Sequence, residues 1–116
     1  MHELGIIQSI FNTLEALAEE HRLTSITRVT LQIGQLQQIV PDMLSFAFEA
    51  VAKGTKAEGA ALEIDIIPIL MQCRTCRTEF TIAEHTYICP HCSGTSLDTL
   101  HGTEIVLESI EGDQDA

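Results

Sequence analysis

The stretch from Cys73 to Cys92 reads CRTCRTEFTIAEHTYICPHC, and it decides what kind of fold this chain of 116 residues builds. It holds all 4 cysteines of the chain, in two pairs that each enclose two residues. Two residues between paired thiolates form a tight knuckle that presents both sulfurs to one tetrahedral ion. Cys73, Cys76, Cys89 and Cys92 are therefore predicted to bind one zinc ion in a closed structural site.

Two disulfides, a thiol–disulfide oxidoreductase and an iron site are the other uses of such a pattern. The chain begins MHELGIIQ, with an acidic residue early and no basic segment, which is unlike a secretory signal peptide. We therefore expect a cytoplasmic protein, in which thiols stay reduced and are better suited to metal than to disulfides. Redox enzymes of the thioredoxin type use one such pair rather than two facing pairs. Iron in the same geometry stays open.

The segment around the cysteines, residues 71–102, has few apolar side chains with which to build a core. Its main ones are Phe80, Ile82, Tyr87 and Leu97. So little apolar surface cannot offset the conformational entropy of a segment of roughly thirty residues. Structural zinc contributes on the order of 10 kcal/mol to folding. We therefore expect residues 71–102 to form a zinc-binding domain whose folding depends on the metal.

Outside this segment, hydrophobic periodicity predicts two helices and three strands. The arrangement that follows is α+β, a small three-stranded sheet packed by two helices, with the four-cysteine zinc-ribbon module inserted between the second and third strands. The acidic tail, residues 111–116, is expected to fray. The predicted helices are residues 3–22 and 41–53, and the second is expected to start at Pro41 and to be stopped by Gly54. The predicted strands are residues 25–33, 62–66 and 105–110.

The chain is strongly acidic, with 17 Asp and Glu residues against 6 Lys and Arg and a formal net charge of −11. Such a charge repels the phosphates of nucleic acid and an anionic membrane surface. No apolar stretch has the roughly 18 residues that a membrane-spanning helix needs. We therefore expect neither nucleic acid nor membrane among its partners, and favour cations or proteins with a basic surface.

No pattern typical of an enzyme is present. The sequence has no glycine-rich phosphate loop, so the protein is not expected to hydrolyse nucleotide. Its serines lack the neighbouring residues that mark a nucleophile. A shell of four thiolates also leaves no open coordination position for a substrate. The sequence therefore predicts a protein that is not an enzyme.

Met1, His2 and Glu3 place several nitrogen donors next to one another. The Met1 amine and the His2 amide close a five-membered chelate ring, and the His2 amide and its own ring nitrogen close a six-membered one. The backbone nitrogen and carboxylate of Glu3 follow directly. A planar set of nitrogens suits Ni(II) or Cu(II) rather than tetrahedral zinc. The alternative is a chance terminus in which Glu3 only favours a helix start.

Several stretches taken together resemble the HypA/HybF family of hydrogenase nickel-incorporation proteins. They are MHEL at the start, VTLQIG at 29–34, SFAFEAV at 45–51 and the two cysteine pairs, and the likeness runs nearly end to end. The resemblance implies a metallochaperone that binds Ni(II) as cargo and zinc as a structural ion. It further implies delivery, with the nickel-handling GTPase HypB, to the large subunit of [NiFe]-hydrogenase, and in some members to urease.

The resemblance also implies roles for particular residues. His2 would be the main nickel ligand, joined by Met1 and Glu3, in a nickel-binding α/β domain of residues 1–70 plus 103–116. Many relatives carry an acidic residue before the proline of the second helix, whereas this chain has Val40 there and Asp42 beyond. The alternative function is a zinc-ribbon adaptor that binds only other proteins. A homodimer stays open.

Overall fold

The computed structural model of the chain describes residues 2–82 and 86–114, and His2 by its backbone alone. Two α-helices, one short 3₁₀ helix and six strands make up this part of the chain. In chain order they are α1 (His2–Glu20), β1 (Leu23–Gly34), η1 (Gln35–Gln37), α2 (Pro41–Ala52), β2 (Ala61–Ile67), β3 (Leu70–Cys73), β4 (Glu79–Thr81), β5 (Leu97–His101) and β6 (Ile105–Gln114).

The chain divides into two compact units, which we describe separately. We call the first the helical unit and the second the cysteine unit. The helical unit consists of Met1–Gln32, Ile39–Asp65 and Val106–Ala116, and the cysteine unit consists of Ile33–Gln38 and Ile66–Ile105.

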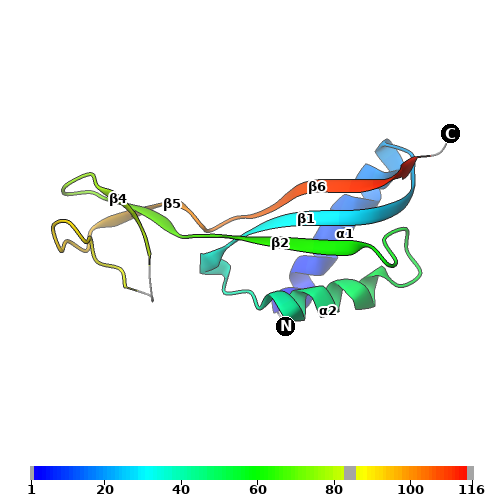
Figure 1. Cartoon of the computed structure of the whole chain (residues 1–116), viewed down its shortest axis with the longest axis horizontal. Helices are drawn as coiled ribbons and strands as arrows, with labels where there is room; N and C mark the ends of the chain where they lie inside the picture. The colour runs from blue at the N-terminus through cyan, green and yellow to red at the C-terminus, as the bar shows by residue number, and fades with distance from the viewer. Residues whose placement is uncertain (1, 83–85, 115–116) are drawn as a thin grey trace. The chain divides into compact units, whose positions relative to one another are not determined.

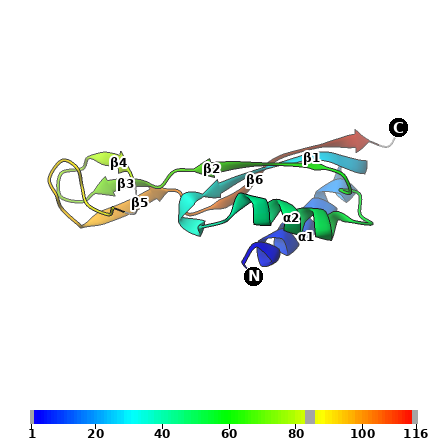
Figure 2. The same ribbon diagram turned by 60° about the horizontal axis from the view of Figure 1, so that its bottom comes forward.

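The helical unit is built on the sheet β2-β1-β6, with β1 in the centre. Both helices lie on the same side of this sheet, as Figures 1 and 2 show from two directions. The predicted α+β class, a three-stranded sheet packed by two helices, is therefore confirmed. The first helix ends two residues earlier than predicted because Arg22 adopts a left-handed φ of 56° that turns the chain into β1.

Apolar side chains from both helices and from β1 fill the space between the helices and the sheet. In α1 they recur at helical spacing, whereas in β1 the buried Val29 and Leu31 are two positions apart and share one face of the strand. The rings of Phe11 and Phe48 join the two helices, with centroids 5.2 Å apart. Side chains that are at most 2% exposed mark the centre of this core: Ile7, Leu14, Ala18, Val29, Leu31, Leu44, Phe48 and Ala52.

The second helix begins and ends as its sequence predicts. Pro41 occupies a first position, where no hydrogen-bond donor is needed, and Asp42 lies in the first turn. At the other end α2 stops at Ala52, and Gly54 takes a φ of 78° that an L side chain rarely adopts. The side chain of Val40, which precedes the helix, makes no capping hydrogen bond, and the N–H of Val40 itself has its partner outside α2.

The expectation of a frayed acidic tail is wrong as far as Gln114. Strand β6 continues through this segment because polar side chains of β1 hold it. The Thr27 hydroxyl donates to the Glu111 carbonyl at 3.1 Å, and the Ser25 hydroxyl donates to the Asp113 carboxylate at 3.0 Å. These bonds join residues far apart in sequence, so the composition of the tail alone did not reveal them. Residues 115–116 lie outside the described part.

The cysteine unit contains the antiparallel sheet β4-β3-β5, whose middle strand pairs Met71 with Phe80 on one side and with Thr99 on the other. Its small core consists of Ile69, Met71 and Ile82, with Phe80 and Leu97 packed against it. Of the four side chains expected to form this core, Tyr87 is exposed. Residues from before and within β3 supply apolar contacts in its place.

Candidate metal centres

The four cysteines lie on two knuckles of the same local form. In the first, Arg77 N–H donates to the Cys73 carbonyl at 2.9 Å, and in the second, Ser93 N–H donates to the Cys89 carbonyl at 2.8 Å. The residue after each second cysteine is left-handed, with φ of 66° at Arg77 and 61° at Ser93. Each turn therefore brings its two thiols to the same side of the chain.

The two knuckles face each other and bring all four sulfurs together. The Sγ atoms of Cys73 and Cys92 are 3.5 Å apart, and so are those of Cys76 and Cys89. All four ligand atoms lie within 4.8 Å of one another. A tetrahedral zinc ion with bonds of about 2.3 Å would separate its sulfurs by about 3.8 Å. The donor set and its dimensions therefore fit a structural metal ion.

The thiols of this cluster are not equivalent. Hydrogen bonds from the side chain and backbone of Thr78 lower the pKa of Cys76 to about 6, and its Sγ lies 3.3 Å from the Thr78 hydroxyl. At Cys92, a backbone hydrogen bond from Gly94 favours the thiolate, but the neighbouring Cys73 thiol and burial outweigh it and raise the pKa to about 12. Four thiolates at this spacing repel one another, so a cation is needed to bring the whole set into the charged form.

Two polar neighbours of the cluster were not identified from the sequence. Thr78 is hydrogen-bonded to Cys76 and lowers its pKa. It lies only two residues after Cys76, so a threonine at this spacing could have been noticed in the sequence. Arg74, inside the first knuckle, pairs with Asp98 on β5 at 2.7 Å, and Asp98 raises its pKa. The Arg74 guanidinium, although it lies inside a knuckle, therefore has a carboxylate partner on β5.

The predicted nickel-binding terminus is described only in part. Met1 lies outside the described residues, and the position of the His2 side chain also lies outside them. What the structure does describe is that α1 begins at His2, so the backbone that follows the first residue is helical. The structure therefore does not test whether the His2 ring and the other predicted nickel ligands come together.

Glu3 is the one described side chain of the predicted nickel site. It is partly buried, and its Oε2 accepts a hydrogen bond from the Val40 N–H at 3.4 Å. Glu3 thereby satisfies the free donor that precedes α2, and its negative charge lies at the positive end of that helix. Asp42 lines the same surface groove as Glu3. The loop before α2 thus meets the start of α1, although Val40 contributes a backbone group and no carboxylate.

Fold and site together define a small protein with a two-helix α+β unit and a four-thiol ribbon that fits a metal ion. A family profile described as "Hydrogenase/urease nickel incorporation, metallochaperone, hypA" matches residues 1–112. The chain belongs to this HypA family of hydrogenase nickel-incorporation metallochaperones. The resemblance inferred from the sequence is confirmed, and so is the expectation of a protein that is not an enzyme, since the family is one of metallochaperones.

Curated relatives match over nearly their whole length. The hydrogenase maturation factor HypA of Desulfitobacterium hafniense is 39% identical over 111 residues, covering 96% of this chain and 97% of that protein. HypA of a Picosynechococcus species is 42% identical, with 96% and 98% covered. The hydrogenase maturation factor HybF of Klebsiella pneumoniae is 34% identical over 113 residues, with 97% and 100% covered.

The fold is also that of a solved structure. The solution structure of the Ni metallochaperone HypA from Helicobacter pylori superposes with a TM-score of 0.70, covers 99% of this chain and 100% of that chain, and is 24% identical. At that identity the likeness concerns the fold. None of the helices in residues 2–82 and 86–114 has the length and apolar character required to cross a membrane.

Proposed function

We propose that this chain binds Ni(II) at Met1, His2 and Glu3 and delivers it to the large subunit of [NiFe]-hydrogenase, with the GTPase HypB as its partner. Membership of the nickel-incorporation family supports the cargo and the pathway. The observation that carries the site is the contact between Glu3 and the Val40 N–H. It ties the third residue of the chain to a second helix, so that a terminus otherwise free to move is held at that point.

The geometry favours a particular division of work between the three residues. The Met1 amine and the two His2 nitrogens form adjacent chelate rings and would supply most of the bonds to nickel. The Glu3 carboxylate already accepts a hydrogen bond, so we assign its backbone nitrogen to the metal and its side chain to positioning. Ligands at a chain end can be displaced one at a time, which suits a protein that must release its cargo.

We assign a structural Zn(II) ion to Cys73, Cys76, Cys89 and Cys92, on the basis of the four sulfurs within 4.8 Å of one another. Residues 71–102 would then act as a zinc-binding domain, and residues 1–70 plus 103–116 as the nickel-binding domain. Delivery of nickel to urease and residence in the cytoplasm complete the proposal. HypB, the hydrogenase subunit and a homodimer are its candidate partners.

Calorimetric titration of nickel into the untagged, zinc-loaded protein tests the assignment of His2. The wild-type protein is expected to bind Ni(II), and the His2→Ala variant is expected to lose at least tenfold in affinity because one chelate ring cannot close. Binding should weaken steeply as the pH falls, since the amine, imidazole and amide must all release protons.

An N-terminal extension provides the matched control, because it removes the free amine while leaving His2 in place. We expect it to weaken nickel binding as His2→Ala does. Equal nickel affinity in the wild-type and His2→Ala proteins would remove His2 from the site. One equivalent of zinc with no specific nickel in the wild-type protein would favour the adaptor function in place of nickel delivery.

A further inference from the structure

The second helix carries two apolar stripes, and folding uses only one of them. Leu44, Phe48 and Ala52 recur at every fourth position and are at most 2% exposed, so they make the contact with the core. A second stripe consists of Met43, Phe46, Ala47 and Ala50, which share a neighbouring face at spacings of three, four and seven residues. We call these four residues the outer stripe.

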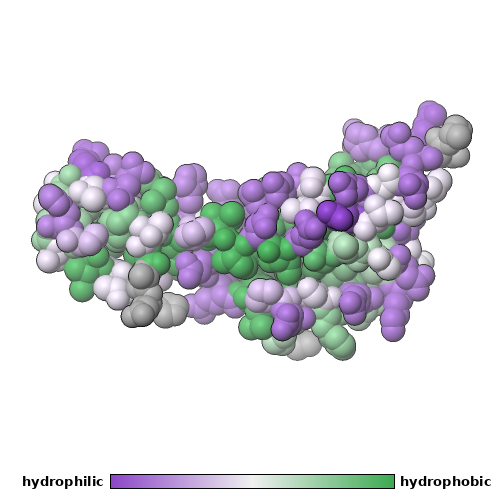
Figure 3. All heavy atoms as spheres, viewed as in Figure 1, coloured by the Kyte–Doolittle hydropathy of each residue, from purple (hydrophilic) through white to green (hydrophobic). Residues whose placement is uncertain are grey.

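The outer stripe exposes its own two large apolar side chains, those of Met43 and Phe46, to solvent. Phe46 is 74% exposed and Met43 is 51% exposed. Apolar residues reach the molecular surface over α2 along the lower edge of Figure 3. Phe46 is the most exposed of the large hydrophobic residues in the described part of the chain. A solvent-exposed aromatic ring contributes little to folding but is a common anchor in protein interfaces.

The outer stripe borders a groove that reaches the start of the chain. The groove has a volume of about 400 Å³, and its lining includes Glu3 and Leu4 from the first turn of α1 and Asp42 from the first turn of α2. The remaining lining residues are the outer stripe itself. Because Glu3 belongs to the proposed nickel terminus, a partner bound in this groove would lie beside the cargo.

The electrostatic character of the two helices indicates what such a partner must carry. Neither α1 nor α2 contains a Lys or Arg residue, whereas α1 carries four carboxylates and α2 carries two. Two of these six, those of Glu3 and Asp42, line the groove itself. A complementary surface is therefore apolar at its centre and basic around it.

A second copy of this chain does not meet that requirement at this surface. Two outer stripes placed together would bring the carboxylates of both copies face to face, and like charges across an interface cost several kcal/mol. The net charge of −11 acts in the same direction. The charges favour a different protein with basic residues.

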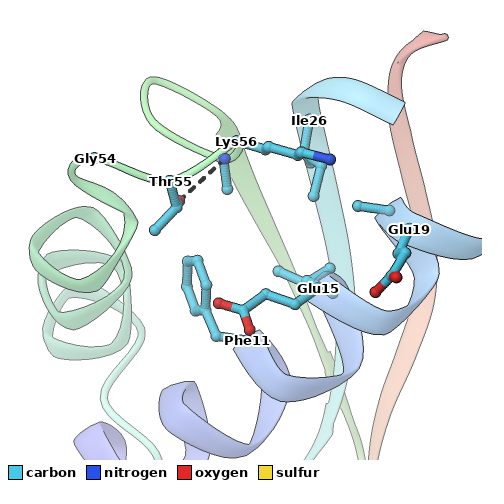
Figure 4. A pocket seen from close by; sticks show the side chains of 10 residues that line it. Phe11, Glu15, Glu19, Ile26, Gly54, Thr55 and Lys56 are labelled. Atoms are coloured by element: carbon cyan, nitrogen blue, oxygen red, sulfur yellow. Dashed lines mark hydrogen bonds between the residues drawn. The ribbon is translucent and has the colours of Figure 1, made fainter. Parts of the chain in front are cut away.

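A second cavity of about 400 Å³, shown in Figure 4, lacks these features. It lies between α1 and the loop after α2, and its apolar lining, Phe11 and Ile26 among others, is at most 5% exposed and already belongs to the core. Lys56 lines it together with the carboxylates of Glu15 and Glu19, so its charges are mixed. It serves as the internal comparison for the groove beside Phe46.

We propose that the groove between the first turn of α1 and the outer stripe of α2 is the docking site for a partner protein. The partner inserts a large apolar side chain against Phe46 and Met43 and places Lys or Arg residues beside Glu3 and Asp42. The proposal rests on the proposed nickel function only for its consequence, namely that the partner is held next to the cargo. The assignment of the docking surface itself is supported by the exposed side chains of Phe46 and Met43, the groove beside them and the carboxylates that line it.

A synthetic amphipathic peptide of leucine and lysine serves as the probe. It should bind the full-length, zinc-loaded protein, and the amide NMR shifts it causes should centre on residues 3–4 and 42–50. Phe46→Ser should weaken binding about tenfold or more, the loss typical of an aromatic anchor. Raising the salt concentration should also weaken binding, because the lysines are screened.

Val106→Ser is the matched control, since Val106 is 40% exposed but lies outside the groove, and it should bind the peptide as the wild type does. Equal binding by Phe46→Ser and wild type, equal binding of a leucine–glutamate peptide, or shifts centred on the cavity of Figure 4 would each overturn the proposal. Circular dichroism of Phe46→Ser verifies its fold, and Met43→Ser repeats the test independently.

Nickel titration separates this proposal from the proposed function. Phe46→Ser should retain the nickel affinity of the wild type, and His2→Ala should retain its peptide affinity. Failure of nickel binding with intact peptide binding would count against the nickel site alone. Failure of peptide binding with intact nickel binding would count against the docking site alone.

Discussion

The helical unit and the cysteine unit reach a folded state by different means. In the helical unit, two helices and the central strand bury a row of large apolar side chains, and the rings of Phe11 and Phe48 meet at its centre. In the cysteine unit, the apolar core consists of Ile69, Met71 and Ile82, and the other buried side chains include Cys73 and Cys89. One unit is stabilised by hydrophobic burial, whereas we expect the other to depend on a metal ion held by its four thiols.

This difference also bears on the two metal sites that we propose. A structural ion enclosed by four thiolates is part of the fold and is not suited to release. A cargo ion must leave, so its ligands belong on a part of the chain whose folding does not depend on it. The helical unit satisfies that condition, because its core lies among side chains that include none of the proposed nickel ligands.

The largest expected effect comes from removing the metal of the cysteine unit. Chelation should lower the stability of this unit by on the order of 10 kcal/mol and unfold it, because its apolar core is too small to replace the metal. Hydrogen exchange should show loss of protection in β3, β4 and β5 and retained protection in α1 and α2. Equal loss in both units would show that they do not fold independently.

The converse experiment weakens the helical unit. Phe48→Ala should cost about 3–5 kcal/mol, because it empties a fully buried site and removes the contact with Phe11. Thermal unfolding checks this loss, and metal content should be unchanged below the transition. Phe46→Ala is the matched control, since the same substitution at a side chain that is 74% exposed should change stability by only about 0.5 kcal/mol. Equal losses would contradict the assignment of the two stripes.

A smaller effect is expected at Gly102 in the cysteine unit. Its φ is 101°, and a Cβ atom there would lie 2.6 Å from the Cα atom of Ile69. Gly102→Ala should therefore cost about 2–3 kcal/mol through backbone strain and steric overlap, measured by denaturant unfolding of the metal-loaded protein. Gly54→Ala isolates the strain, because its φ is 78° with no atom within 4 Å, and should cost about 1 kcal/mol. Equal costs would exclude the overlap.

The smallest change concerns the pH dependence of metal binding by the cysteine unit. In the folded knuckles the pKa of Cys76 is about 6, below its ordinary value of 9.0, so this thiol gives up its proton to a metal ion readily, and protons compete for it only as the pH falls through about 6. Thr78→Val removes the hydroxyl and should raise this pKa, so that metal is lost at a higher pH, whereas Thr78→Ser should preserve the wild-type profile. Metal content measured against pH checks both variants, and identical profiles of Thr78→Val and wild type would exclude the hydroxyl as the cause.

Much of the fold could be predicted because its signals are local. The periodicity of α1, the alternation in β1 and the helix start and stop signals at Pro41 and Gly54 each depend only on residues close together in the sequence. Strands β3, β4 and β5 were not predicted because, at three to five residues, they are too short for a period to be recognised in the sequence. The extension of β6 escaped it because hydrogen bonds from a distant strand hold an acidic segment.

The sequence by itself identified the candidate metal ligands, because the two pairs of cysteines and the adjacent Met1, His2 and Glu3 can be read from it directly. The tertiary structure decided what surrounds them: Thr78 beside Cys76, Asp98 beside Arg74, and the Val40 N–H on the carboxylate of Glu3. It also decided that Phe48 is buried while Phe46 is exposed, two positions apart on one helix. Which side chains can be metal ligands follows from their chemistry. Which side chains are buried, and which groups hydrogen-bond to the candidate ligands, depends on the distant segments that the folded chain brings together.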